Sequence, residues 1–379
     1  MSGKGGQSRW EVRLLAVIAA TLTVFGIASV YSAASFQSKA WVEVLKQLSG
    51  AAIGGMVLLI ASRVDYRRWR PLAWPLLGGT LLLLLLVIAP GVPDSIVPVR
   101  NGARRWIQLP LLSFQPSEIA RFVIVVWVSA IAFKKGAQIR EFKKGILPVL
   151  LVTALVAGLV MVEPNLSLAT VLALLGGVVL FVAGARIGQF LLLGVTGLFL
   201  LMGAVQAFPH SFRRVNCFLG LADCQGADWQ VGQAVLGLAS GRWIGLGFGE
   251  GQLKLNYLPY APSDFLFSTI GEEWGFLGVT FVIGLFALFC WVGFRIARQA
   301  RDPFGQLLAA GLTASIGLSA LMHMAVNLSL MPTTGQTLPF MSAGRSSLIV
   351  TLLAVGVVIS VGRGPAPARS RGRAGRADE

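Results

Sequence analysis

Long apolar runs separated by short polar segments dominate this chain. The runs are about 17 to 24 residues long, which is the length that an α-helix needs to cross the hydrocarbon core of a bilayer. We therefore predict an all-α integral membrane protein with about ten transmembrane helices. The first run lacks a small-residue cleavage site, so it is interpreted as a span and not as a signal peptide. The predicted spans cover residues 12–35, 45–62, 72–90, 117–134, 146–162, 167–184, 188–208, 267–294, 304–328 and 346–362.

Composition supports this class and excludes a soluble domain. Hydrophobic residues make up 55% of the 379-residue chain and charged residues only 13%, against about 25% charged residues in an average soluble protein. The mean hydropathy is +0.74. The polar segments are too short for a separate soluble catalytic module, so residues 1–362 are predicted to form one polytopic membrane domain.

The net charge of +16 does not indicate nucleic acid, because the basic residues gather in short loops on alternate sides of the predicted spans. The positive-inside rule then places both termini in the cytoplasm. It also places a long extracytoplasmic loop, residues 209–264, between spans seven and eight. The basic, Gly/Pro-rich tail 363–379, "RGPAPARSRGRAGRADE", is predicted to be disordered and to contact anionic membrane lipids.

One basic cluster opposes the charge rule. The segment "VRNGARRWIQ" lies in a short outer loop and carries Arg100, Arg104 and Arg105. Cations in such a loop are expected to favour the opposite orientation unless they serve another purpose. An anionic ligand on the outer face would account for them.

The long loop contains "LASGRWIGLGFGEGQLKLNYLP", in which Gly245 and Gly247 belong to an alternating glycine series. No strand-to-helix context flanks these glycines, so they do not indicate a nucleotide-binding loop. A flexible, closely packed re-entrant segment is the better interpretation, because irregular backbone at membrane depth must line protein or a watery cavity. Cys217 and Cys224 lie in the same loop, where either a disulfide or two free thiols is compatible with the sequence. No Cys/His spacing typical of a metal site is present.

The stretch "PSDFLF" places a carboxylate, Asp264, at the start of an apolar helix. Ser263 is a natural N-cap and would put Asp264 in the first turn. Asp264 could then simply complement the helix dipole, or it could act as a base. An ionised group near membrane depth is costly, so its presence there is a reason to consider a function. Glu272 and Glu273 lie too far along the helix to share a proton with it, and we expect them to pair with basic groups from other spans.

A second charged constellation opens the fourth predicted span in "FQPSEIARF". Gln115 and Pro116 precede the helix, and Glu118 and Arg121 have the spacing of an intrahelical ion pair. The pair could neutralise itself at the membrane boundary or could form the charged wall of a polar cavity. A third segment, "MPTTGQTLPFMSAGRSSL", contains Pro339, Ser342 and Arg345 and predicts an ordered loop before the last span.

Five segments together resemble a known family. The chain is similar to the SEDS proteins (shape, elongation, division and sporulation), the family of FtsW, RodA and SpoVE. The resemblance is carried by "NGARRWIQL", "FQPSEIAR", "SGRWIGLGFGEGQLKLNYLP", "SDFLFSTIGEEWGFLG" and "LMPTTGQTLPFMSAGRSSL". The segments "FRRVNCFL" and "TTGQTLPF" look more like FtsW, the division branch, than RodA.

The resemblance implies an inverting peptidoglycan glycosyltransferase that polymerises lipid II, the undecaprenyl-linked disaccharide peptide, at the outer face of the cytoplasmic membrane during division or shape maintenance. It implies a class B penicillin-binding protein transpeptidase as partner, together with other division or elongation proteins. A divalent cation, Mg or Mn, is a possible cofactor by the same resemblance. A lipid II flippase and a non-catalytic scaffold for the transpeptidase are the two alternatives.

The resemblance also assigns residues. The catalytic aspartate of the family maps onto Asp264, which would act as general base while undecaprenyl pyrophosphate leaves. Expected substrate-binding residues are Arg104, Arg105, Glu118, Arg121, Lys254, Ser342 and Arg345. Motif residues expected to act structurally are Gln115, Pro116, Glu163, Pro164, Gly245, Gly247, Glu272, Glu273 and Pro339.

Three segments depart from the family pattern. The usual "EPDLG" reads "EPNLS" with Asn165, "ExHTDF" reads "YAPSDF" with Tyr260 and Pro262, and "SYGGSS" reads "SAGRSS" with Arg345. Asp264 is retained throughout. These departures concern substrate tuning and metal use and leave the reaction class as expected.

Overall fold

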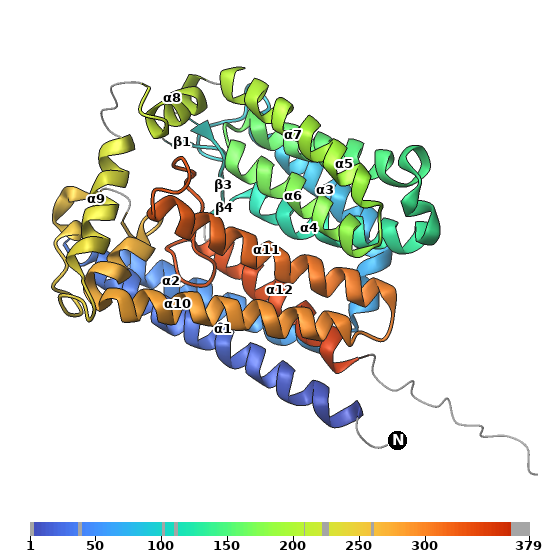
Figure 1. The fold of residues 1–379 in the computed structure, drawn as a ribbon, viewed down its shortest axis with the longest axis horizontal. Helices are drawn as coiled ribbons and strands as arrows, with labels where there is room; N and C mark the ends of the chain where they lie inside the picture. Colours follow the sequence, from blue (N-terminus) through green and yellow to red (C-terminus); the bar gives the residue numbers. More distant parts are fainter. Residues whose placement is uncertain are drawn as a thin grey trace, which may run out of the picture.

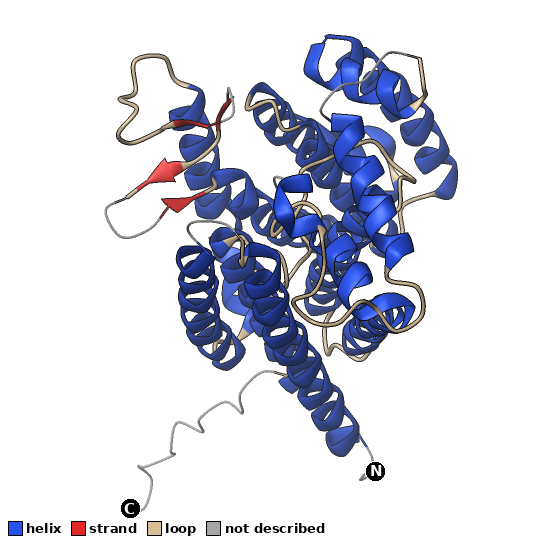
Figure 2. Cartoon of the chain, turned by 90° about the vertical axis from the view of Figure 1, so that its left-hand side faces the viewer, coloured by secondary structure: helices blue, strands red, loops and turns tan. Residues whose placement is uncertain are grey.

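The computed structural model describes residues 4–36, 40–100, 103–109, 113–207, 209–221, 227–258 and 261–364. Within these ranges the chain is a bundle of long helices that carries two very short β-hairpins at one end (Figures 1 and 2). Eight of the described helices have the length and apolar composition of membrane spans. The structure thus confirms an all-α, multi-pass membrane protein.

The helices follow the predicted spans closely. They are α1 (Lys4–Ala34), α2 (Ala40–Arg63), α3 (Trp69–Ile88), α4 (Pro116–Lys135), α5 (Leu147–Val162), α6 (Leu166–Val182), α7 (Ile187–Ala207), α10 (Leu266–Arg298), α11 (Pro303–Asn327) and α12 (Arg345–Arg363). Short turns η1 (Tyr66–Arg68), η2 (Gly136–Arg140) and η3 (Phe142–Ile146) join some of them. The predicted spans 167–184 and 188–208 correspond to α6 and α7; α6 has 17 residues, slightly fewer than the roughly 20 that a span needs.

Two hairpins precede α4 and were not predicted. Strand β1 (Val99–Arg100) pairs antiparallel with β2 (Ala103–Arg104), and β3 (Ile107–Gln108) pairs with β4 (Ser113–Phe114). Val87, Val97 and Ile107 form a small apolar cluster beneath them. The hairpins therefore sit on the end of the bundle and give Arg104 and Arg105 a defined backbone position.

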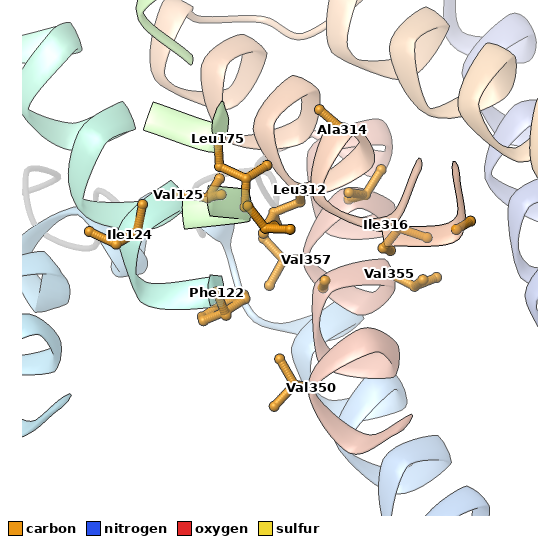
Figure 3. Packing of buried hydrophobic residues seen from close by; sticks show 14 of the residues in the cluster. Phe122, Ile124, Val125, Leu175, Leu312, Ala314, Ile316, Val350, Val355 and Val357 are labelled. Carbon is orange, nitrogen blue, oxygen red and sulfur yellow. The ribbon is translucent and has the colours of Figure 1, made fainter. Parts of the chain in front are cut away.

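The centre of the bundle is formed by α4, α11 and α12, which are the most enclosed of the long helices. Figure 3 shows the packing there: Val125 of α4, Leu175 of α6, Leu312 of α11 and Val357 of α12 lie close together. Helices with apolar residues on every face are expected in such a position. The other helices surround this centre and expose apolar side chains that suit a lipid environment.

The start of α1 and the end of α12 lie at one end of the bundle, and the hairpins lie at the opposite end (Figure 1). The second of these ends also carries α8 (Pro209–Phe218) and α9 (Ala227–Ser240) from the long loop between α7 and α10. This arrangement agrees with two termini on one side of the membrane. Assignment of that side to the cytoplasm remains a prediction from charge.

Helix α10 is interrupted at Gly275, which adopts the left-handed region at φ 64°. The glycine-rich segment that follows α9 repairs the interruption with backbone hydrogen bonds. Leu246 N donates to Glu272 O at 3.0 Å and Gly247 N to Glu273 O at 3.1 Å. In the other direction, Phe276 N donates to Arg242 O at 2.8 Å and Leu277 N to Trp243 O at 3.2 Å.

This splice satisfies four backbone groups that a broken helix would otherwise leave unpaired in an apolar environment, where each costs several kcal/mol. It requires close approach: a Cβ on Gly245, whose φ is 83°, would lie 2.1 Å from the carbonyl oxygen of Glu273. The structure therefore supports the closely packed segment predicted for this glycine series. We call residues 242–247 and the adjoining residues 272–277 the α10 splice.

Candidate active site

Asp264 lies in the turn that precedes α10, at the end of the bundle that carries the hairpins. Its side chain is half-buried and faces two guanidinium groups, those of Arg214 and Arg105. Burial raises the pKa of the Asp264 carboxyl, while the hydroxyl of Ser263 and the two arginines act in the opposite direction. A carboxylate with a raised pKa is a stronger base than an exposed one, and the cations keep an ionised form accessible.

The predicted cap of this helix is wrong. The N-cap position is Phe265, without a side-chain cap, so Ser263 and Asp264 precede the helix. A distant amide replaces the local cap: Oδ1 of Asn327 in α11 accepts hydrogen bonds from Ser268 N at 3.1 Å and from Ser268 Oγ at 2.8 Å. The same amide donates from Nδ2 to the carbonyl oxygen of Asp264 at 3.1 Å. Asn327 therefore both caps α10 and fixes the backbone of the candidate base.

Arg105 approaches Asp264 from the segment between the hairpins. Its Nε donates to Glu163 O at 2.8 Å, and its Nη2 donates to Pro164 O, so the main chain after α5 holds the guanidinium in place. Arg104 turns away: it pairs with Asp94 at 2.7 Å and donates to Val92 O at 3.3 Å. Of the two arginines in this segment that were expected to bind substrate, the structure brings Arg105 to the candidate base.

Arg214 of α8 was not among the predicted site residues. It is half-buried, donates from Nη1 to Thr333 O at 3.0 Å and acts electrostatically on Asp264. Burial lowers the pKa of both Arg105 and Arg214, but guanidinium groups remain protonated in proteins. The resemblance segment "FRRVNCFL" contains Arg214, and this was the signal that could have identified it. Nearby, Cys217 is disulfide-bonded, while Cys224 lies outside the described residues.

The loop between α11 and α12 wraps around Asp264. A Cβ on Gly335 would lie 3.7 Å from Oδ2 of Asp264. Ala343 N donates to Pro262 O at 2.9 Å. His323 of α11 fixes the same loop through a 2.7 Å hydrogen bond from Nδ1 to Gln336 O. The predicted ordered loop is thus held from both sides.

Two further residues expected to bind substrate belong to the end of this loop. Ser342 is buried, and its hydroxyl accepts from Leu338 N at 2.9 Å next to Pro339. Arg345 begins α12 and packs against α2, where a Cβ on Gly50 would lie 3.1 Å from its Cγ. These contacts fix the loop and the start of α12, and a role of either residue in substrate binding stays a prediction.

Glu118 and Arg121 form the ion pair that their spacing predicts, with Nη2 and Oε2 3.1 Å apart and both side chains almost fully buried. Arg121 also donates from Nη1 to Ser319 of α11 at 2.8 Å. Pro116 is the first residue of α4, and Gln115 donates to the Ser117 hydroxyl at 3.0 Å. The pair links α4 to α11 inside the central packing.

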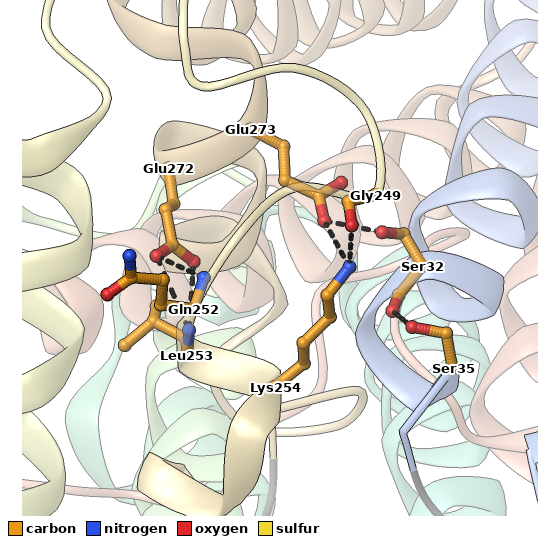
Figure 4. Close-up of polar contacts among 8 residues, drawn as sticks. All are labelled: Ser32, Ser35, Gly249, Gln252, Leu253, Lys254, Glu272 and Glu273. Carbon is orange, nitrogen blue, oxygen red and sulfur yellow. Dashed lines mark hydrogen bonds and ion pairs between the residues drawn. The ribbon is translucent and has the colours of Figure 1, made fainter.

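Glu272 and Glu273 were predicted to pair with basic groups from other spans. In the described part of the chain their partners come instead from the long loop and from Ser32 of α1 (Figure 4). Glu272 accepts from the backbone amides of Gln252, at 2.7 Å, and Leu253. Glu273 accepts from the Ser32 hydroxyl and lies 3.8 Å from Nζ of Lys254. Lys254 also donates to Gly249 O, so it stabilises the loop near the α10 splice instead of facing Asp264.

A divalent cation as cofactor stays a prediction from the family resemblance. The described residues contain no group of three or more His, Cys, Asp or Glu side chains that could hold a metal ion. The carboxylate that lines the site, Asp264, already faces two cationic side chains. Among the described residues, Arg105 and Arg214 supply positive charge near Asp264.

Comparisons with known proteins agree with this architecture. Residues 9–365 match the family model of FtsW, RodA and SpoVE, described as a cell cycle protein. A probable peptidoglycan glycosyltransferase FtsW from Trichlorobacter lovleyi is 38% identical over 93% of each chain. Stage V sporulation protein E from Bacillus subtilis is 35% identical over 92% of this chain and 96% of that protein.

Solved structures show the same fold. A chain of a peptidoglycan synthase complex, described for its coordination of polymerization and crosslinking, superposes with a TM-score of 0.75 at 31% identity and covers 92% of this chain and 96% of its own. The rod shape determining protein RodA of Thermus thermophilus gives a TM-score of 0.66 at 29% identity, with 92% and 95% covered. The chain belongs to the FtsW/RodA/SpoVE family of multi-pass membrane proteins.

Proposed function

We propose that this protein is a peptidoglycan glycosyltransferase that polymerises lipid II at the outer face of the cytoplasmic membrane. The observation that carries the proposal is that two arginines from separate segments, Arg105 and Arg214, act electrostatically on one carboxylate, Asp264. Family membership and the names of the relatives support a glycosyltransferase. The two arginines give the site the charge that a pyrophosphate-linked sugar needs.

In the proposed reaction, Asp264 accepts the proton of the 4-hydroxyl of the acceptor N-acetylglucosamine. That oxygen attacks the anomeric carbon of the donor sugar, the bond from this carbon to the pyrophosphate oxygen breaks, and the configuration inverts. Undecaprenyl pyrophosphate leaves with the bonding electrons. Negative charge therefore grows on the pyrophosphate while the proton moves to Asp264.

Arg105 and Arg214 are proposed to stabilise this growing charge. Fixed cations in a site with restricted water access stabilise a developing anion more than they would in bulk water, because they need no reorganisation. Arg105 is held by two backbone carbonyls and Arg214 by one, so both guanidinium groups are preorganised. Three other cations were expected to neutralise this charge but have other partners in the structure: Arg104, Arg121 and Lys254. We therefore assign charge neutralisation to Arg105 and Arg214.

A class B penicillin-binding protein is the proposed partner, since one similar solved structure is a peptidoglycan synthase complex that coordinates polymerization and crosslinking. Such a partner would crosslink the strands that this protein makes. Other division or elongation proteins are proposed by the same family argument. Activity should therefore be measured with and without a co-purified transpeptidase.

The test is polymerisation of lipid II by the purified protein in detergent, where no membrane sidedness exists. A glycosyltransferase forms glycan polymer under these conditions, whereas a flippase or a scaffold does not. We expect Asp264→Asn to reduce the rate by about a hundred- to ten-thousand-fold, the usual contribution of a positioned general base. Asp94→Asn is the matched control, because Asp94 is an exposed carboxylate on the same end of the bundle. Near-normal polymer from the Asp264 variant refutes the assigned role.

A further inference from the structure

Glu163, at the end of α5, is a buried acid without a conventional partner. It is only 1% exposed, and neither of its carboxyl oxygens accepts a hydrogen bond of normal geometry from the described part of the chain. An ionised carboxylate in such a place is costly, because burial removes its water without an equivalent replacement. The Glu163 carboxyl is therefore expected to carry a proton when no ligand is bound.

The surroundings of Glu163 connect it to the candidate active site. Two groups of the described residues act on its carboxyl: the Arg105 guanidinium and the Ser117 hydroxyl of α4, which itself accepts a hydrogen bond from Gln115. Burial raises the pKa of Glu163 to about 8, and the influences of Ser117 and Arg105 only partly offset this rise.

Arg105 is bound to the backbone carbonyls of Glu163 and Pro164 and not to the carboxyl group. The same guanidinium acts on Asp264 and is repelled by Arg214. Arg105 therefore interacts electrostatically with two acids, the half-buried Asp264 of the site and the buried Glu163. Its charge attracts an anion in the site most strongly while Glu163 is neutral.

We propose that Glu163 is a positioning residue that controls how strongly Arg105 attracts the pyrophosphate of a bound substrate. In its protonated form it leaves the positive charge of Arg105 directed at the site. In its ionised form it becomes the counter-ion of Arg105 and competes with the pyrophosphate. This role rests on the proposed function, because it presupposes a pyrophosphate-linked ligand near Arg105.

The direction of the effect follows from Coulomb attraction. In a partly buried site, a carboxylate and a nearby guanidinium attract each other several times more strongly than they do in bulk water. Ionisation of Glu163 therefore lowers the positive potential at the site. Ligand affinity should fall as the pH rises through the titration of Glu163, while Arg105 and Arg214 remain protonated throughout.

The experiment measures binding and does not depend on turnover. The full chain in detergent is titrated with farnesyl pyrophosphoryl N-acetylglucosamine, whose pyrophosphate diester keeps a constant charge between about pH 6 and about pH 9.5. All variants carry Asp264→Asn, so that the titration of Asp264 does not contribute. We expect Kd to increase about tenfold across this range when Glu163 is present, and to stay constant and tight when it is replaced by Gln.

A second variant protects the test if Glu163→Gln fails to fold. Ser117→Ala removes a group that lowers the pKa of Glu163, so the midpoint of the binding profile should move to higher pH. An alkaline loss of affinity that persists unchanged in Glu163→Gln overturns the proposal. If only Ser117→Ala can be measured, an unmoved midpoint overturns it.

The proposed function and the role of Glu163 can fail separately. Absence of probe binding at every pH would remove the pyrophosphate site and, with it, both the proposed function and this inference. Binding that depends on Arg105 but has the same pH profile with and without Glu163 would leave the proposed function intact and overturn only the role of Glu163. If Glu163→Gln binds the probe tightly and no longer loses affinity as the pH rises, the inference is supported. A purely structural role of Glu163 would not produce this result.

Discussion

Gly245 and Gly275 pack backbone against backbone, although one lies in the loop after α9 and the other inside α10. A Cβ added to Gly275 would lie 2.3 Å from the backbone nitrogen of Gly245, and one added to Gly245 would lie 2.1 Å from Glu273 O. A contact this close excludes any side chain on either residue. The α10 splice depends on it.

We therefore expect Gly245→Ala to destabilise the protein strongly. The substitution combines a left-handed backbone, which costs an L-residue about 1–2 kcal/mol, with a steric clash against the main chain. Gly249→Ala is the matched control, because Gly249 has the same φ of 83° but no atom within 4 Å of the added methyl group. The measurement is the thermal unfolding midpoint in detergent, and equal losses in the two variants would contradict the steric explanation.

Replacement of Arg214 should impair catalysis without unfolding the protein. Loss of one fixed cation at a developing anion commonly reduces the rate by about a hundred- to a thousand-fold. We expect Arg214→Ala to reduce the polymerisation rate by a factor in or just below that range. Arg213→Ala is the comparison, since Arg213 is an exposed neighbour on the same helix. Polymerisation rates with lipid II check the prediction, and similar rates for both variants would remove Arg214 from the site.

The pair formed by Glu118 and Arg121 should matter chiefly for stability. Arg121→Met leaves a buried, unpaired carboxylate, which typically costs about 3–5 kcal/mol. The exposed pair of Glu43 and Lys46 at 2.6 Å provides the contrast, because Lys46→Met should cost less than about 1 kcal/mol. Chemical unfolding of both variants tests this, and a small effect of Arg121→Met would show that Glu118 finds another partner or a proton.

Glu163 should also affect stability as a function of pH. Its pKa is raised to about 8 in the folded protein, whereas a free glutamate titrates near pH ~4.3. Between these values the folded state binds one more proton than the unfolded state, so stability decreases as the pH rises. Glu163→Gln should remove this component of the decline. Unfolding measured at a series of pH values checks the slope, and parallel curves for the two proteins would contradict it.

Hydropathy predicted the helices well because a bilayer leaves the backbone few alternatives. The spans fell close to the observed elements, including the long α10 and the final α12. The hairpins were missed because strands of two residues have no detectable period. Arg104 and Arg105 have different partners at the end of β2, where Arg104 is the last residue of the strand and Arg105 follows it. Hydropathy does not show where so short a strand ends.

The remaining errors arose from contacts between distant segments. Ser263 had the local pattern of an N-cap, yet the capping hydrogen bond comes from Asn327 of another helix. Apart from Ser32, the partners of Glu272 and Glu273 came from the loop because the α10 splice brings residues 249–254 against them. Similarly, nothing local distinguishes Arg214 from Arg213, and only the fold shows which one turns toward Asp264.

The α10 splice has a mechanical consequence. Since the loop segment and the first turns of α10 share reciprocal hydrogen bonds, they should move as one rigid body, and a single residue, Phe265, separates that body from Asp264. Any force applied to the outward surface of the loop, for instance at Trp243, would therefore tilt the carboxylate without an intervening hinge.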